Sequence, residues 1–553
     1  MNSHSSYLRA RERARHMTCV GAGARLPGRD REVHTDVLVV GAGPAGLTTA
    51  ITLARAGADV LVVERHSGTS PFPKATGINT RTMELLRGWG LDQRVRAGGM
   101  RVRPAVTSSE TLIGPELASS ATTFPSEQQA LAVSPTAPSF CAQDHLEPIL
   151  LAHLVAHGGR DRFNTELTDL RLTPAGVIAE VVDRESGRQT RVHARYVVGA
   201  DGPRSTVRSL LGIDVQDLGT LGEFVAVTFR ADLAARMPRI PSVINVVERV
   251  GAEGLFVPTS NDGRWIYAHP ADDRTRDYPE VLRTVTGVAD LDPHILTVMR
   301  FVMGAQVATT LRRGPAFLVG DAAHRTTPMG GIGMNTAIQA AHNLGWKLAW
   351  VLRGHAGEAL LDSYQAERLP VGRANALRSL ETEAPVGTEY DPLAIDLGVA
   401  YSSAVIARAP GAVALETTST GSDSLMRAVT GRRAPHAWIL KGGRRVSTLD
   451  LFEDRLTLVS GYDGARWQAA ADALATHGLP ITALAAGSDF HPVDRSFEER
   501  YRLGSADAVL VRPDGYLVHR LAGSDGDTPA MLRAAVELAL GANTGTASLV
   551  RAG

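Results

Sequence analysis

Cysteine is scarce in this sequence, and its scarcity restricts both redox and metal chemistry. Cys19 and Cys141 are the only cysteines among 553 residues. Two cysteines are too few for a disulfide framework or a thiolate metal site, and they form no CxxC motif. We therefore expect no metal cofactor and no thiol redox centre. A reducing cytoplasm is the expected compartment.

An excess of charge of either sign is also absent. Lys+Arg and Asp+Glu number 58 each, for a formal charge of +0. Affinity for nucleic acid or anionic membranes normally appears as a basic excess, so neither is an expected partner. The uncharged run 37–54 approaches transmembrane length, but three glycines and a proline interrupt it. Residues 1–35 have no apolar segment of a secretory signal. We expect a soluble protein without a membrane partner.

The hydrophobic patterning is that of a multi-domain α/β protein. A continuous apolar strand near Val37, a helix at 44–56 and a second strand at 59–63 form a βαβ unit. We predict a disordered tail at 1–34 and a nucleotide-binding domain in two parts, at 35–217 and at 307–400, the second of which contains a long helix. A mostly antiparallel sheet domain at 218–306 separates the two parts. A linker at 401–424 leads to a last unit at 425–553.

A glycine-rich turn, Gly41-Ala-Gly-Pro-Ala-Gly46, joins the first predicted strand to the first helix. In such a turn the first glycine permits the tight bend, the second lets the backbone approach a pyrophosphate, and the third permits close helix–strand packing. Glu64, 18 residues after Gly46, would accept hydrogen bonds from an adenosine ribose. The candidate cofactor-binding residues here are Gly41, Gly43, Ala45, Gly46, Glu64 and Arg65. The motif alone separates neither FAD from NAD nor a ligand site from a bare glycine-rich turn.

Two later segments, Val197–Ser205 (VVGADGPRS) and Leu318–His324 (LVGDAAH), each follow a predicted strand. With these three fingerprints in this order, the chain resembles the class A FAD-dependent aromatic hydroxylases, in particular the polyketide hydroxylase, phenol 2-monooxygenase and tetracenomycin-type oxygenase branch. The resemblance implies a Rossmann-like FAD-binding domain and a ribityl contact from Asp321, beside Gly320. It places Asp201 where the requirements of FAD and NAD(P)H overlap. The alternative is that both aspartates only cap turns.

The segment Thr326–Asn335 (TTPMGGIGMN) leaves backbone amides uncovered just before the long helix, which suits it to stabilise negative charge. The resemblance places the Met334 and Asn335 backbone at the flavin, and Pro328 on the substrate side of the ring. It further implies FAD contacts from five other positions of this sequence. The residues that it adds are Lys74, Arg81, Gln143, Pro328, Gly331, Gly333, Met334 and Asn335. A helix–sheet contact remains the alternative for the glycines, and a solvated helix face for Arg81.

The sequence has no second GxGxxG motif for a separate NADPH domain. The resemblance implies that non-covalent FAD swings out to meet transiently bound NADPH, with NADH as an alternative, and then reacts with O2. The C4a-hydroperoxide formed would hydroxylate or otherwise oxygenate an electron-rich ring. The resemblance also implies a thioredoxin-like C-terminal domain, which this sequence matches at Gly431–His436 and Val509–Tyr516. Because the sequence has no CxxC motif there, we expect the domain to serve as structural support or as a dimer surface.

The substrate prediction rests on the middle segment. Phe256, Trp265 and Tyr267 are candidates for the wall of a pocket that suits a polycyclic aromatic polyketide of antibiotic biosynthesis. Strand alternation puts Trp265 and Tyr267 on one face and Ile266 on the other, and the first face could equally be core. No acid/base catalytic residue is required. The alternatives are a simple phenol hydroxylase, a Baeyer–Villiger-type oxygenase, a halogenase, a flavin dehydrogenase or a non-catalytic flavoprotein. We expect a monomer or a homodimer.

Overall fold

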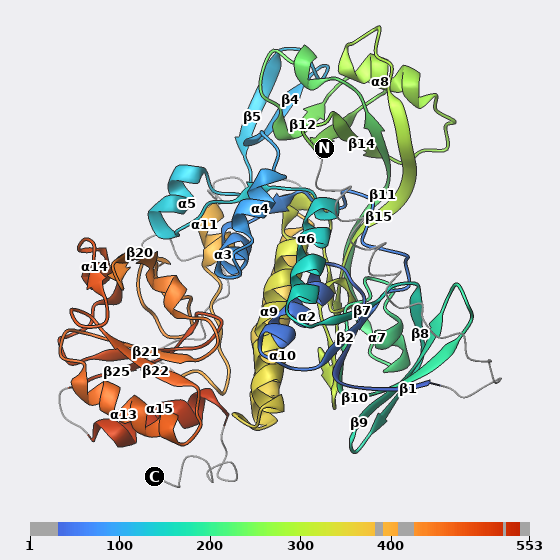
Figure 1. Cartoon of the computed structure of the whole chain (residues 1–553). Coiled ribbons are helices and arrows are strands. Elements are labelled where there is room, and N and C mark those ends of the chain that lie inside the picture. Colours follow the sequence, from blue (N-terminus) through green and yellow to red (C-terminus); the bar gives the residue numbers. More distant parts are fainter. Residues whose placement is uncertain (1–30, 382–390, 408–424, 524–526, 542–553) are drawn as a thin grey trace, which may run out of the picture.

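The computed structural model describes residues 31–381, 391–407, 425–523 and 527–541. Figure 1 shows two long helices, α9 (Gly333–Leu352) and α10 (Ala359–Arg378), at the centre of the molecule. One sheet domain lies above them in this view, and the C-terminal domain lies beside them. The predicted tail at 1–34 falls almost wholly outside the described residues, as does 408–424 of the predicted linker.

The first sheet is mainly parallel at its centre, because its inner strands are apolar on both faces. Val37 to Val40 are at most 6% exposed. β1 pairs in parallel with β10 and with β2, and β10 with β17. The strand order is β16-β17-β10-β1-β2-β7, with β8 and β9 extending from β10. These strands are β1 (Arg31–Val40), β2 (Val60–Val63), β7 (Arg160–Arg162), β8 (Thr165–Thr173), β9 (Gly176–Asp183), β10 (Gln189–Gly199), β16 (Arg312–Arg313) and β17 (Ala316–Leu318).

β1 begins earlier than the sequence pattern predicts. The prediction starts the ordered chain near Asp36, whereas the strand runs from Arg31 and pairs there with Thr190 of β10. The alternating polar residues 31–35 did not read as a buried strand. They are part of β1 because β10 supplies backbone partners, although Glu32 and His34 are exposed. This pairing is long-range, and local composition does not contain it.

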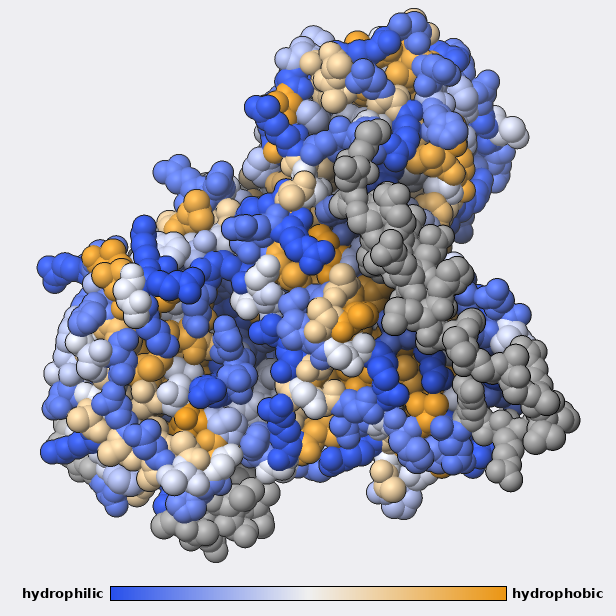
Figure 2. Space-filling model, viewed as in Figure 1, coloured by the Kyte–Doolittle hydropathy of each residue, from blue (hydrophilic) through white to orange (hydrophobic). Residues whose placement is uncertain are grey.

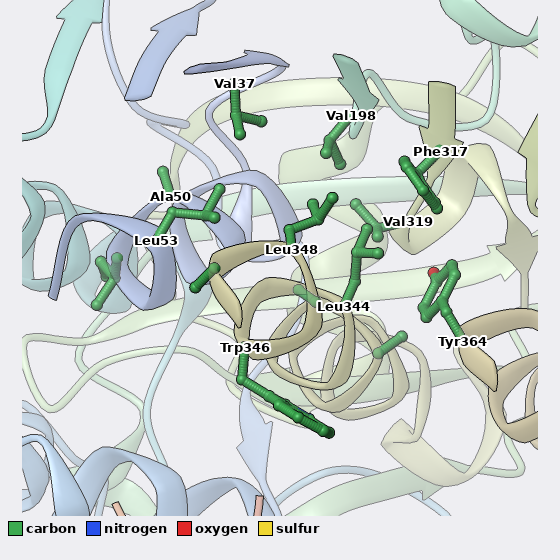
Figure 3. Packing of buried hydrophobic residues seen from close by; sticks show 14 of the residues in the cluster. Val37, Ala50, Leu53, Val198, Phe317, Val319, Leu344, Trp346, Leu348 and Tyr364 are labelled. Carbon is green, nitrogen blue, oxygen red and sulfur yellow. The ribbon is translucent and has the colours of Figure 1, made fainter. Parts of the chain in front are cut away.

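Helices α2 (Pro44–Arg55), α6 (Gln143–Ala156) and α9 pack together beside the first sheet. α2 follows the glycine-rich turn and packs against α9 and α6. Figure 3 shows Leu344 and Leu348 of α9 on the side of the helix toward Val198 and Phe317, and Trp346 on the opposite side. The predicted helices at 44–56, 143–157 and 333–352 are confirmed within one residue at each end. The one predicted at 81–90 is α3 (Thr80–Gly88), which ends two residues earlier.

The second sheet carries the predicted antiparallel domain, but it is larger than the range 218–306. Its order is β18-β15-β11-β14-β13-β12-β4-β5, and β4 pairs with β12 in parallel. β4 and β5 therefore come from a segment that the pattern assigned to the first domain. The strands are β4 (Arg103–Ser109), β5 (Glu116–Ala121), β11 (Val215–Arg230), β12 (Ser242–Val247), β13 (Gly254–Pro258), β14 (Arg264–Pro270), β15 (His294–Ala308) and β18 (His324–Arg325). α8 (Tyr278–Thr286) covers one face.

The C-terminal domain has the strand order of a thioredoxin-like fold. In its four-stranded sheet, β22-β21-β24-β25, the first pair is parallel and the others are antiparallel. The elements are β21 (Leu456–Ser460), α13 (Ala465–Thr476), β22 (Ile481–Ala485), β24 (Ala508–Val511), β25 (Leu517–Leu521) and α15 (Thr528–Ala539). The sequence has no cysteine after Cys141, so this domain has no thiol chemistry.

Buried ion pairs join the C-terminal domain to the long helices. Glu367 of α10 accepts both Arg512 Nη1 (2.7 Å) and Nη2 (3.0 Å), and Lys347 Nζ of α9 lies 2.8 Å from the same carboxylate. These three side chains are fully enclosed. Arg512 also pairs with Asp514 at 2.7 Å. Because a buried charge must be compensated, these contacts fix how the two domains meet.

The surface in Figure 2 is mixed, with hydrophilic residues broken by small hydrophobic groups. Among the described residues, none of the helices combines the length and apolarity that crossing a bilayer requires.

Candidate active site

The three glycines of the turn between β1 and α2 are required for two different reasons. Gly41 has φ +106°, and a Cβ there would lie 2.4 Å from the carbonyl oxygen of Ala200. A Cβ on Gly46 would lie 1.9 Å from the Gly41 carbonyl oxygen. Gly43, the N-cap of α2, has no atom within 4 Å of such a Cβ. The first and third glycines are therefore required by packing, whereas the second faces an open space at the helix N-terminus that fits a pyrophosphate.

Glu64 lies at the end of β2, directly beside this turn. Its Oε2 accepts the Ala42 backbone amide at 2.9 Å, and its Oε1 accepts the His66 amide at 2.9 Å. The carboxylate thus holds the turn and remains only partly buried, as a ribose-binding acid must be. The neighbouring Arg65 is exposed. Ala45 is buried at the start of α2, where it contacts the backbone next to Gly320 and contributes packing.

Asp321 is the carboxylate in this region without a protein partner. It is exposed, and no hydrogen bond or ion pair to it occurs among the described residues. Surrounding protein nevertheless raises the pKa of its carboxyl by desolvation, while Arg325 and Lys74 oppose the rise. An accessible carboxylate without a protein partner fits the hydroxyl groups of a ribityl chain. Gly320, with φ +62°, brings the chain against Ala45 of α2.

Asp201 differs from Asp321, because groups a few residues further along the chain already hydrogen-bond to its carboxylate. Its Oδ1 accepts the Ser205 hydroxyl and its Oδ2 accepts the Val207 amide at 3.0 Å. These contacts cap the short helix α7 (Thr206–Leu210). The structure therefore supports the turn-capping interpretation for Asp201, and its contact with a cofactor stays a prediction.

The N-terminus of α9 closes the site from the other side. Gly331 has φ +61°, and a Cβ on Gly333 would lie 2.5 Å from Thr326 Oγ1, so side chains are excluded from this turn. Asn335 is 1% exposed. Its Nδ2 donates to the carbonyls of Gly77 and Gly331, and its Oδ1 accepts the Asn79 amide, each at 3.0 Å.

The Asn335 side chain therefore ties two loops together, and the amides at the start of α9 stay free of partners within the helix. Met334 is buried beside it. Pro328 is exposed next to this turn, and its place on the substrate side of the ring stays a prediction.

Arg81 does not lie where the resemblance implies. It is 7% exposed, its Nη1 bonds Glu84 at 2.8 Å, and its Nη2 donates to the Asp514 carbonyl at 2.6 Å. Its guanidinium therefore belongs to the contact with the C-terminal domain, and the predicted cofactor role is corrected. No local signal reveals this, because Asp514 is 433 residues away in the sequence.

Gln143 and Lys74 remain candidates with different surroundings. The Gln143 amide donates to Glu147 Oε1 at 2.7 Å, and Glu147 Oε2 accepts the Ser70 amide at 2.7 Å, so the pair holds the 70–75 loop. Lys74 is exposed in that loop, and its charge acts on both Glu147 and Asp321. Its charge thus reaches Asp321, and its contact with the cofactor stays a prediction.

The predicted pocket wall requires a second correction. Phe256, Trp265 and Tyr267 are at most 2% exposed and pack in the core between the sheet and α8. They are enclosed because α8 contributes Leu282 and Val285 to the same cluster. These three side chains therefore form core. The opposite face is half-buried and apolar, as the strand alternation requires. Its residues include Ala226, Ile244, Val246, Leu255, Val257 and Ile266.

One ion pair that sequence reasoning missed links this sheet to the FAD-binding domain. Arg264 Nη1 of β14 lies 2.6 Å from Asp144 Oδ2 at the start of α6, and both side chains are largely buried. Asp144 follows Gln143 directly, so the contact fixes the second sheet relative to the start of α6. The two residues are 120 positions apart, so only correlated substitutions at positions 144 and 264 in related sequences would have revealed this ion pair.

The comparisons agree with this geometry. Residues 34–379 match the family profile described as FAD binding domain, and residues 427–543 match the aromatic-ring hydroxylase C-terminal profile. Tetracenomycin A2 monooxygenase-dioxygenase of Streptomyces glaucescens is 36% identical, over 92% of this chain and 97% of that protein. An aklavinone 12-hydroxylase of Streptomyces purpurascens is 38% identical, over 89% and 96%.

Solved structures show the same architecture. A ternary complex of aklavinone-11 hydroxylase with FAD and aklavinone has a TM-score of 0.82 and 34% identity, covering 93% of this chain and 100% of that one. The open cradle at Gly43, the unpartnered Asp321 and the free amides of α9 fit the cofactor of that structure. The chain is therefore an FAD-dependent aromatic monooxygenase and belongs to the aromatic-ring hydroxylase family.

Proposed function

We propose that this enzyme oxygenates a polycyclic phenol or quinone of the aromatic polyketide class, in antibiotic biosynthesis. The observation that supports the substrate size is the half-buried apolar sheet face around Ile266, whose strand β14 is linked to the FAD-binding domain by the Arg264–Asp144 ion pair. Arg264, on that face, is already paired with Asp144, so the wall offers no free arginine for a small carboxylate. Relatives that act on tetracenomycin and aklavinone support this class.

FAD, when bound, takes reducing equivalents from NADPH and activates O2 for the transfer of one oxygen atom. The protein's part is to bind, orient and exclude water. The amides after Gly43 bind the pyrophosphate, and Asp321 accepts hydrogen bonds from the ribityl chain. The amides of Gly333 to Asn335 stabilise negative charge on the ring. The apolar face of the second sheet keeps water from the reacting atoms.

The choice of reductant and the nature of the oxygenation belong to the same proposal. We infer NADPH as the reductant, with NADH as the alternative. The nicotinamide would bind only transiently, because the described residues contain one dinucleotide-binding turn, and that turn would hold FAD. Hydroxylation is the leading reaction and Baeyer–Villiger insertion the alternative. We also propose a cytoplasmic enzyme that works as a monomer or a homodimer.

Product analysis tests the function. The FAD-loaded enzyme is incubated with NADPH, ¹⁸O2 and a panel that runs from phenol and hydroxybenzoate to tetracyclic phenols and quinones. We expect NADPH oxidation coupled to one ¹⁸O atom in a multi-ring product, identified by mass spectrometry. Efficient coupling with phenol alone would contradict the substrate class. NADPH oxidation without ¹⁸O incorporation would indicate a dehydrogenase.

A further inference from the structure

A cavity of about 190 Å³ lies between the FAD-binding domain and the C-terminal domain, away from the flavin site. Its walls come from α2, α3, the second half of α9 and the C-terminal domain. Trp346 on its lining is 12 residues after Met334, which at 1.5 Å per residue is about 18 Å along the helix. Figure 3 shows Trp346 on the side of α9 away from the first sheet.

The lining is unusually aromatic for this chain. Trp89, Trp346 and Trp350 all line it, which is half of the chain's 6 tryptophans. His342 and His355 complete the aromatic wall. Burial lowers the pKa of His342 to about 4, so this ring is neutral at physiological pH. The walls therefore suit the faces of a flat aromatic ring system.

A polar group on the wall lacks a partner. Trp346 is 4% exposed, and its Nε1–H has no acceptor among the described residues. A buried N–H without an acceptor is costly, and the indole that carries it forms part of the aromatic wall.

The charge at one edge of the cavity is also uncompensated. Arg55 ends α2 and Arg353 follows α9, and both are exposed and without an ion-pair partner among the described residues. The exposed carboxylates of the lining, Glu453 and Asp454, come instead from the C-terminal domain, and Asp454 is paired with Arg455. The Arg353 guanidinium lies over Gly57, just beyond the end of α2, so the two cations share one edge. Other arginines of the lining are already paired, Arg81 with Glu84 and Arg87 with Asp450. An anionic group at this edge would find two free guanidinium groups.

The volume sets the size of the ligand. One water needs roughly 10–15 Å³ of such space, so the cavity holds on the order of a dozen to twenty non-hydrogen atoms. Two fused rings with a carboxylate have about a dozen, and a four-ring polyketide has about twice that number.

We propose that this interdomain cavity is a second binding site, separate from the flavin site, for a two-ring aromatic carboxylate. The rings lie against the tryptophans and the carboxylate points toward Arg55 and Arg353. The inference does not depend on which substrate the enzyme oxygenates. Because the ligand would contact both domains, its binding stabilises their contact.

The test is calorimetric titration of the FAD-loaded enzyme with 2-naphthoate, together with the visible flavin spectrum. We expect saturable binding without a change in flavin absorbance, and at least tenfold weaker binding of the neutral 2-naphthalenemethanol. The Arg55→Ala/Arg353→Ala double variant should bind naphthoate at least tenfold more weakly.

A matched control, Arg444→Ala/Arg466→Ala, removes two exposed arginines outside the cavity and should bind as the unchanged enzyme does. Equal affinity in the Arg55/Arg353 variant would overturn the proposal. Binding that always perturbs the flavin spectrum would assign the ligand to the substrate pocket instead. If naphthoate does not bind at millimolar concentration, the cavity holds only water, and the proposal of a second binding site is overturned.

Discussion

At the scale of single residues, Gly43 is the clearest test of where the cofactor binds. A side chain at this position meets no protein atom, so it enters only the space assigned to the pyrophosphate. We expect Gly43→Val to fold normally and to weaken FAD binding at least 100-fold, measured by flavin fluorescence on the apoprotein. Gly88→Val is the matched control, since Gly88 also has open space and lies far from the turn along the chain. Unchanged FAD affinity in Gly43→Val would refute the placement.

Asp321 provides a complementary prediction, in which binding and stability change in different directions. Its carboxylate has no protein partner, and desolvation raises its pKa, so its charge contributes no stability to the apoprotein. We expect Asp321→Asn to keep or slightly raise the melting temperature without FAD, and to weaken FAD binding at least tenfold. Asp201→Asn is the contrasting variant, because it loses helix-capping contacts and should lower the melting temperature of the apoprotein. A stability loss confined to Asp321→Asn would contradict this assignment.

At the scale of elements, α3 is fixed by a buried carboxylate whose effect depends on pH. Arg433 and Arg81 hold the pKa of Glu84 at about 2, against an ordinary 4.5, despite the desolvation that opposes them. A depressed pKa stabilises the fold above pH 4.5, and this stability is lost as the pH falls through about 2. The shift corresponds to on the order of 3 kcal/mol.

We therefore expect Glu84→Gln to be less stable than the unchanged protein at pH 7, and the difference to shrink at pH 3. Thermal unfolding at both pH values measures it. Glu127→Gln, at an exposed position, should show no such dependence. A difference that is constant with pH would show that Glu84 acts through packing alone.

At the scale of the whole molecule, the contact between the C-terminal domain and the long helices depends on buried charge. Arg512→Met would leave Asp514 and Glu367 enclosed without their main cation. Removing one partner of a buried pair typically costs about 3–5 kcal/mol, and we expect that loss in urea unfolding followed by tryptophan fluorescence. The double variant Arg512→Met/Glu367→Gln should recover part of it. A single variant as stable as the exposed Arg444→Met control would refute the role of this contact.

The sequence by itself determined the βαβ start, the glycine-rich turn, the order of the three fingerprints and the long helix after Gly333. These features are local, since buried strands and tight turns are encoded by neighbouring residues, and spacing alone brings Glu64 to Gly43. Only the tertiary structure decided which sheet face is open and what Arg81 binds. Alternation separates Tyr267 from Ile266, but α8 decides which of the two is covered. The partners of Arg81, β1 and Arg264 lie far along the chain, and contacts over such distances leave no periodic trace in a single sequence.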